Sequence, residues 1–267
     1  MFVPDPVAFN IFGLGIRWYA ILICAGMIIA TAIAYKRAPG HGIDPDSLLD
    51  YVLVGLPCGI IGARAYYVLF NWSYYSDSLF RIINIREGGL AIHGGLIFGL
   101  GSVYILSRMK KDNVLNIFDL TAPCLALAQS IGRWGNFFNQ EAYGGPTDLP
   151  WAILVDGEYV HPTFLYESLW CLLLFFVLSY VDKRRKFTGQ VILLYGILYS
   201  LERFFVESLR TDSLMLGPFK QAMVLSAAAF AVCVILDIVL ARRHRGGSNG
   251  SPAAVRRTGK NKEIKEK

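Results

Sequence analysis

An arginine, two amides and a carboxylate lie close together in the stretch IGRWGNFFNQEAYGG, positions 131–145. They are Arg133, Asn136, Asn139 and Glu141, and they follow the apolar run IFDLTAPCLALAQS. A guanidinium binds phosphate oxygens in pairs, and amides can add hydrogen bonds to the same headgroup. An unpaired charge inside a membrane span costs roughly 2.5–3.5 kcal/mol. This arginine therefore needs an anionic partner, or else it reaches the membrane surface and serves only as an anchor.

A second charged group lies in the stretch YSLERFFVESLRTD, near the end of a later apolar segment. Tyr199, Arg203 and Glu207 follow at intervals of four residues, which places them on one face of a helix. Arg210 comes three residues later. Arg203 and Glu207 could be a purely structural ion pair, or both arginine stretches could face one lipid phosphate. Carboxylates that could share the pairing are Glu141, Glu167, Glu202 and Glu207.

A histidine and a tyrosine are further candidates. His93 lies in REGGLAIHGGLIFGLG, between the glycine pairs 88–89 and 94–95. Such glycines favour close helix packing, or a broken backbone whose N–H groups face an anion. A histidine alone in an apolar helix is as often a packing residue as a functional one. Tyr19, in the RWY of the first apolar segment, is also typical of the aromatic belt at a membrane surface.

The segments that would position these residues are long and apolar. Of the 267 residues, 54% are hydrophobic and 17% are charged, whereas a soluble domain carries roughly 25% charge. A spanning helix needs about 20 mostly apolar residues. The sequence thus predicts an all-α polytopic membrane protein with about seven spans, the fourth of them short unless it runs on into the 131–145 stretch. The predicted spans are 18–34, 49–70, 90–107, 117–131, 164–181, 190–205 and 222–240.

Basic residues predict how this bundle is oriented. The connections after the first, third and fifth spans carry YKRAPG, SRMKKD and DKRRKF, whereas the opposite side has few Lys or Arg. By the positive-inside rule the N-terminus lies outside and the C-terminus lies in the cytoplasm. The candidate residues then gather at the outer side. Between spans four and five, residues 136–162 form a small outward-facing loop or head, with turn signals that suit a short strand pair or a lid.

The domain organisation is simple. We expect one transmembrane catalytic domain over residues 1–241 and a basic, disordered cytoplasmic tail over 242–267. The five cysteines all fall in apolar blocks, which predicts packing residues and not disulfides or catalytic thiols. The N-terminus lacks the basic region of a cleaved signal peptide. No residue group has the usual metal-ligand spacing, so no metal or other cofactor is expected, and no nucleic-acid partner.

These motifs together resemble the bacterial prolipoprotein diacylglyceryl transferase family. The matching stretches are RWYAIL, GGLAIHGGL, GRWGNFFNQEAYG, HPTFLYES and YSLERFFVESLRTD, in the expected order and over nearly the whole chain up to the last span. The pattern GRxGNFxNxExxG is specific in a chain of seven spans, whereas the other stretches are modest individually. The family usually has proline and aspartate after the last arginine, where this chain has RTD. That small departure leaves the class unchanged.

The resemblance implies a reaction in the bacterial cytoplasmic (inner) membrane. The diacylglyceryl group of phosphatidylglycerol moves to the thiol of the lipobox cysteine in a prolipoprotein signal peptide. A thioether forms and glycerol phosphate leaves. Both substrates reach the site laterally from the bilayer lipid, and the active site faces outwards.

The resemblance also suggests a role for each residue. Arg133 and Arg203 would stabilise the departing phosphate, on which negative charge develops. Asn136 and Asn139 would bind the headgroup, and His93 is the expected proton acceptor for the thiol. The other expected site residues are Tyr19 and Gly144, which would contact or closely approach the substrate, and Glu141, Tyr199, Glu207 and Arg210, which would hold the others in place.

Two other classes of protein stay open at this point. A transporter or channel for a small anion would also carry Arg, Glu and His inside the membrane. Paired broken helices in two matching halves would favour it, but the sequence has only one glycine-interrupted span. A non-catalytic assembly protein would pair its polar residues among themselves and would lack a lipid-sized cavity.

Overall fold

The protein is a bundle of long helices with short strand pairs at one end. The computed structural model describes residues 5–85, 88–211 and 213–246. Every predicted span coincides with a long helix. These helices are α1 (Trp18–Arg37), α2 (Pro45–Phe70), α5 (Ile92–Lys110), α6 (Val114–Asn139), α7 (Thr163–Asp182), α8 (Gln190–Leu209) and α9 (Gln221–Gly246).

Six of the described helices are long and apolar enough to cross a membrane. The exception is α8, which has the length but carries three charged residues, Glu202, Arg203 and Glu207. Of these, Arg203 and Glu207 are expected site residues, and Glu202 is one of the carboxylates that could pair with an arginine. Several predicted boundaries were short by a few residues. The helix α6 runs on into the 131–145 stretch and ends at Asn139, the alternative that the sequence left open, while α8 reaches Leu209 and α9 continues past 240 to Gly246. The rest of the predicted tail lies outside the described residues.

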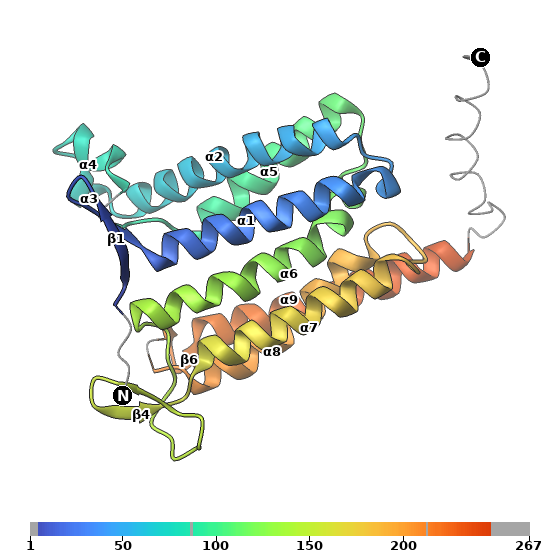
Figure 1. The fold of residues 1–267 in the computed structure, drawn as a ribbon. Coiled ribbons are helices and arrows are strands. Elements are labelled where there is room, and N and C mark those ends of the chain that lie inside the picture. The colour runs from blue at the N-terminus through green and yellow to red at the C-terminus, as the bar shows by residue number, and fades with distance from the viewer. Residues whose placement is uncertain (1–4, 86–87, 212, 247–267) are drawn as a thin grey trace.

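The helices form two groups. Figure 1 shows α2 and α5 side by side along one flank and α7, α8 and α9 along the other, with α1 and α6 between them. Glycines allow α2 and α5 to pack closely. A Cβ on Gly94 would lie 2.3 Å from the Gly62 carbonyl oxygen, and a Cβ on Gly62 would lie 2.3 Å from Phe98 Cβ. The glycines around His93 thus serve helix packing in part, as the sequence suggested.

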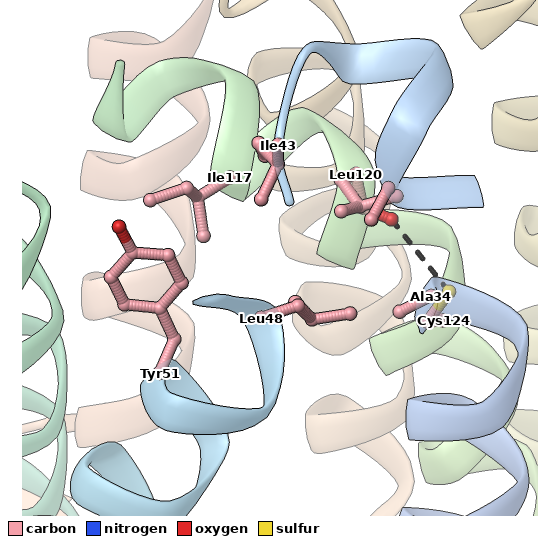
Figure 2. Close-up of a cluster of buried hydrophobic side chains, with 8 residues drawn as sticks. Ala34, Ile43, Leu48, Tyr51, Ile117, Leu120 and Cys124 are labelled. Carbon is pink, nitrogen blue, oxygen red and sulfur yellow. Dashed lines mark hydrogen bonds between the residues drawn. The ribbon is translucent and has the colours of Figure 1, made fainter. Parts of the chain in front are cut away.

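A cluster of buried apolar residues joins α2 to α1 and α6 at one end of the bundle (Figure 2). We call it the base cluster. Its members come from α1, from α2, from α6 and from the connection that contains the 3-10 helix η1 (Ala38–His41). Tyr51 lies at its edge, where its hydroxyl donates to Asp112 Oδ2 at 2.6 Å. The base cluster consists of Ala34, Ala38, Ile43, Leu48, Tyr51, Ile117, Leu120 and Cys124.

Asp119 lies near the base cluster and caps a neighbouring helix. Its fully buried carboxylate accepts hydrogen bonds from the backbone N–H groups of Gly189, Val191 and Ile192 at 2.7–3.0 Å, at the start of α8. Asp119 belongs to α6, so its charge serves the start of another helix and not of its own. A carboxylate at a helix N-terminus satisfies donors that would otherwise be unpaired.

The opposite end of the bundle, which we call the site end, carries three antiparallel strand pairs. In the segment expected to form the outer loop, β3 (Ile153–Val155) pairs with β4 (Glu158–Val160), which confirms the predicted strand pair. Two further pairs were not predicted: β1 (Val7–Ile11) with β2 (Leu14–Arg17), and β5 (Met215–Leu216) with β6 (Phe219–Lys220). The short helices α3 (Trp72–Tyr75) and α4 (Leu79–Ile83) also lie at this end (Figure 1).

Candidate functional site

Glu167 joins the two arginines that the sequence singles out. Its Oε1 accepts a hydrogen bond from Arg203 Nη1 at 2.8 Å, and its Oε2 lies 3.1 Å from Arg133 Nη1. Glu207, one turn after Arg203, lies 2.6 Å from Arg203 Nη2. These residues come from α6, α7 and α8, and together with Tyr199 of α8 we call them the arginine cluster.

The carboxylates of the arginine cluster are buried, whereas its arginine side chains are partly exposed. The exposed fraction of the side chain is 1% for Glu167, but 21% for Arg133 and 20% for Arg203. Paired carboxylates offset the cost of placing arginines inside a bundle. The exposed part of each guanidinium can still bind an external anion. Tyr199 Oη lies 3.4 Å from Arg133 Nη2, which further orients that group.

Glu202 adds a third carboxyl group beside the arginine cluster. It is buried, and it lies within electrostatic range of Glu167, Arg133 and Arg203. Neither of its side-chain oxygens has a hydrogen-bond partner among the described residues. Of the four carboxylates that the sequence offers as partners, the structure brings Glu167 and Glu207 into ion pairs with the arginines.

Glu141 organises a second polar group at the end of α6. Its Oε1 accepts hydrogen bonds from Asn136 Nδ2 at 3.1 Å and from Asn139 Nδ2 at 3.2 Å. Because α6 stays helical to Asn139, Arg133 and Asn136 are one turn apart at i,i+3. The helix ends at Gln140, whose positive φ turns the chain and brings Glu141 back over both amides. The second polar group therefore adjoins the arginine cluster through α6.

Tyr19 packs against α6 at the same end. A Cβ on Gly135 would lie 2.6 Å from Tyr19 Cδ2, so only glycine allows the ring this close. Its neighbour Trp18 stacks on Phe138 with ring centroids 5.2 Å apart. The glycine of the GRWGN motif therefore positions Tyr19 between the N-terminal strand pair and the polar end of α6.

His93 stands apart from these groups. It is the second residue of α5, it is exposed, and its ring centroid lies 6.2 Å from that of Tyr66 in α2. Within residues 5–85, 88–211 and 213–246, no hydrogen bond to its ring is found. The structure thus joins Arg133, Arg203, Glu207 and Tyr199, and separately joins Asn136, Asn139 and Glu141, but it links His93 to neither group by a hydrogen bond.

Gly144 packs closely against two other segments of the chain. Its N–H donates to the His161 carbonyl at 2.9 Å, and a Cβ there would lie 2.7 Å from His161 Cβ and 3.1 Å from the Leu209 carbonyl oxygen. Gly144 also forms an isolated bridge with Arg210. In the structure this glycine and Arg210 attach the 140–162 segment to the end of α8, and the expected close approach of Gly144 to the substrate stays a prediction.

Arg64 is an organising residue that the sequence reasoning missed. Its side chain is buried in α2, and its five N–H groups donate to five backbone carbonyls at 2.5–3.0 Å. The guanidinium carbon also lies 4.9 Å from the ring centroid of Tyr75. The five carbonyls belong to the segment that leads to His93: Arg81, Ile82, Asn84, Gly88 and Gly89. Its position in the middle of the apolar run GIIGARAYYVLF could have indicated that this arginine has buried partners.

Known proteins similar to this chain share its whole length up to the last helix. A model of the family described as prolipoprotein diacylglyceryl transferase matches residues 6–239. The chain belongs to this family. It is 51% identical over 241 residues to the phosphatidylglycerol–prolipoprotein diacylglyceryl transferase of Clostridioides difficile (strain 630), covering 90% of this chain and 97% of that protein. It is 52% identical over 235 residues to the enzyme of that name from Finegoldia magna, covering 88% and 95%.

Membership of the prolipoprotein diacylglyceryl transferase family decides the class of protein. The chain is a transferase and a multi-pass membrane protein, as the motifs and the apolar helices predicted. Nothing favours the transporter, channel or assembly-protein alternatives. In this transferase the specific pattern GRxGNFxNxExxG covers the end of α6 and the turn after it, and it supplies Arg133 to the arginine cluster and all three residues of the second polar group.

Proposed function

We propose that this chain transfers the diacylglyceryl group of phosphatidylglycerol to the thiol of the lipobox cysteine in prolipoprotein signal peptides. The observation that carries this proposal is the arginine cluster. Two arginine side chains, each about a fifth exposed, are held together by one buried carboxylate near the end of an apolar bundle, where both could contact the same phosphate. An anionic phospholipid headgroup has the charge and geometry that such a site binds.

The proposed chemistry is a displacement at a glycerol carbon. The cysteine sulfur bonds to that carbon, the bond from the carbon to the phosphate oxygen breaks, and its electron pair leaves on glycerol phosphate. Arg133 and Arg203 would stabilise the charge that gathers on the departing phosphate. Asn136 and Asn139 would bind the headgroup, and Tyr19 would contact the substrate. Glu141, Glu207, Tyr199 and Arg210 would hold these groups in place.

The thiol must lose its proton to become a strong nucleophile. We assign the removal of this proton to His93. Its side chain is exposed at the site end and makes no hydrogen bond to another described residue. The proton would later pass to water or to the released phosphate. The same proposal places the site end at the outer face of the cytoplasmic membrane, because the basic connections lie at the other end of the helices.

Arg133→Lys tests the proposal. Lysine keeps the positive charge but lacks the planar fork that binds two phosphate oxygens. We expect the variant to fold and to transfer diacylglyceryl about 10²-fold more slowly or worse. The measurement is the mass gain of a lipobox peptide incubated with purified protein and phosphatidylglycerol vesicles.

Arg108→Lys is the matched control for this substitution. Arg108 is exposed near the far end of α5, away from the site end, so its variant should transfer at the rate of the unmodified protein. Full activity of Arg133→Lys would reduce Arg133 to a membrane anchor. No mass gain with the unmodified protein would refute the proposed reaction itself.

A further inference from the structure

A cavity of about 590 Å³ lies between two pairs of helices. The pair α2 and α5 forms one wall, and α1 and α6 form the other. None of the described residues that line it is charged. The hydroxyls of Tyr51 and Thr121, two of its few polar side chains, already donate to Asp112 and to the Ile117 carbonyl. A cavity with such a lining suits an apolar ligand.

The cavity has the length of one lipid chain. Its lining on α2 runs from Leu48 to Ala63, which is about 22 Å along a helix axis. An extended hydrocarbon advances about 1.25 Å per carbon, so this length holds roughly 18 carbons.

The two ends of the cavity differ. At the site end it is lined by Leu90, Ala91 and Ile92, the three residues directly before His93. At the other end it meets the base cluster, since Leu48 and Tyr51 belong both to the lining and to the cluster (Figure 2). A ligand inside would keep its polar end near the proposed reaction and its apolar end against fully buried side chains.

The side wall gives lateral access. Leu56, Ile60 and Leu96 line the cavity and are also exposed on the outer surface of α2 and α5. In a membrane protein that surface faces lipid tails, so a chain can enter from the bilayer without crossing water.

We infer that this cavity holds one acyl chain of the diacylglyceryl group, and that the base cluster limits the length of the chain accepted. The inference rests on the proposed function. A chain that is too long must buckle against Leu48 and Tyr51. One that is too short leaves an empty end whose lining loses its van der Waals contacts. Selection by chain length follows, because the same chain in the bilayer meets neither penalty.

Substitutions at the closed end test this inference. Val52 lines the cavity one turn from Leu48, so Val52→Phe shortens it, whereas Leu48→Ala deepens it. Each variant receives an equal mixture of phosphatidylglycerols with twelve, fourteen, sixteen or eighteen carbons per chain, and mass spectrometry of the peptide product gives the chain lengths transferred. We expect Val52→Phe to raise the ratio of shortest to longest product about tenfold, and Leu48→Ala to lower it. Val54→Phe, the same change at an exposed position of α2 outside the lining, should keep the original ratio.

A binding measurement separates failure of this inference from failure of the proposed function. Phosphatidylglycerol with a photoreactive diazirine at the last carbon of a chain is cross-linked to the unmodified protein, and the labelled peptides are mapped. We expect labels at 48–52 and at Val103, whether or not the protein transfers diacylglyceryl. Labels confined to the outer surface would overturn the inference, and so would unchanged product ratios in both cavity variants. Labels at the closed end without any transfer would support the cavity and reject the reaction.

Discussion

At the scale of single residues, Glu167 matters most for the arginine cluster, because its one buried carboxylate holds both arginines. Glu167→Gln keeps the shape of the side chain but removes the charge. Arg203 then keeps only Glu207 as an ion-pair partner, and Arg133 keeps none within the described cluster. Removing one member of a buried charge group typically costs about 3–5 kcal/mol. We expect a lower unfolding temperature in detergent and a transfer rate reduced about 10²-fold, because both guanidinium groups lose their fixed orientation.

The control for Glu167→Gln is Glu158→Gln, the same change on the exposed strand β4. It should alter neither the unfolding temperature nor the transfer rate. If Glu167→Gln behaved like this control, the arginines would be held by the backbone packing of α6 and α8, and the carboxylate would have no part in the site.

At the scale of elements, Arg64 decides how the segment between α4 and α5 is held. Five carbonyls share its five donors, whereas a lysine has three donors and no planar fork. Arg64→Lys leaves at least two of these carbonyls without this partner, at about 1–3 kcal/mol for each that stays buried. We expect faster hydrogen exchange of the amides between residues 79 and 92, measured by mass spectrometry, with exchange in α6 unchanged.

Arg81→Lys is the matched control for Arg64→Lys, because Arg81 lies in the same segment with an exposed side chain. Its variant should exchange like the unmodified protein. Equal protection in both variants would show that the positive φ of Gly88 and Gly89, and not the guanidinium, determines the path of this segment.

At the scale of the whole molecule, the orientation in the membrane follows from charge. The basic connections lie at the base end of the helices, so we expect the site end to face outwards. Asp148 is exposed in the segment between α6 and α7. A single-cysteine variant at this position, Asp148→Cys in a background without the native cysteines, should react in intact cells with a maleimide that cannot cross membranes. Lys111→Cys, between α5 and α6, should react only after the membrane is opened. The reverse pattern would invert the proposed site.

Much of this protein could be predicted from local patterns in its sequence. Apolar runs of about 20 residues predict a bundle of spanning helices, because backbone polar groups in lipid must be satisfied within a helix. The i,i+4 spacing of Tyr199, Arg203 and Glu207 predicts their common face, and in the structure Arg203 and Glu207 pair. The five cysteines, all within the described ranges, are free, as their apolar positions suggested.

Only the tertiary structure decided which distant residues meet. Three carboxylates besides Glu207 were open as partners for the arginines, and the packing of α6, α7 and α8 selected Glu167. Arg64 was missed because its partners are backbone carbonyls, which every residue has and no side-chain pattern reveals. The cavity depends on how α2 and α5 stand away from α1 and α6, and the distance between helix pairs is set by side chains far apart in the chain. Local periodicity fixes which face of a helix is apolar, but the contacts between faces arise only when the helices pack.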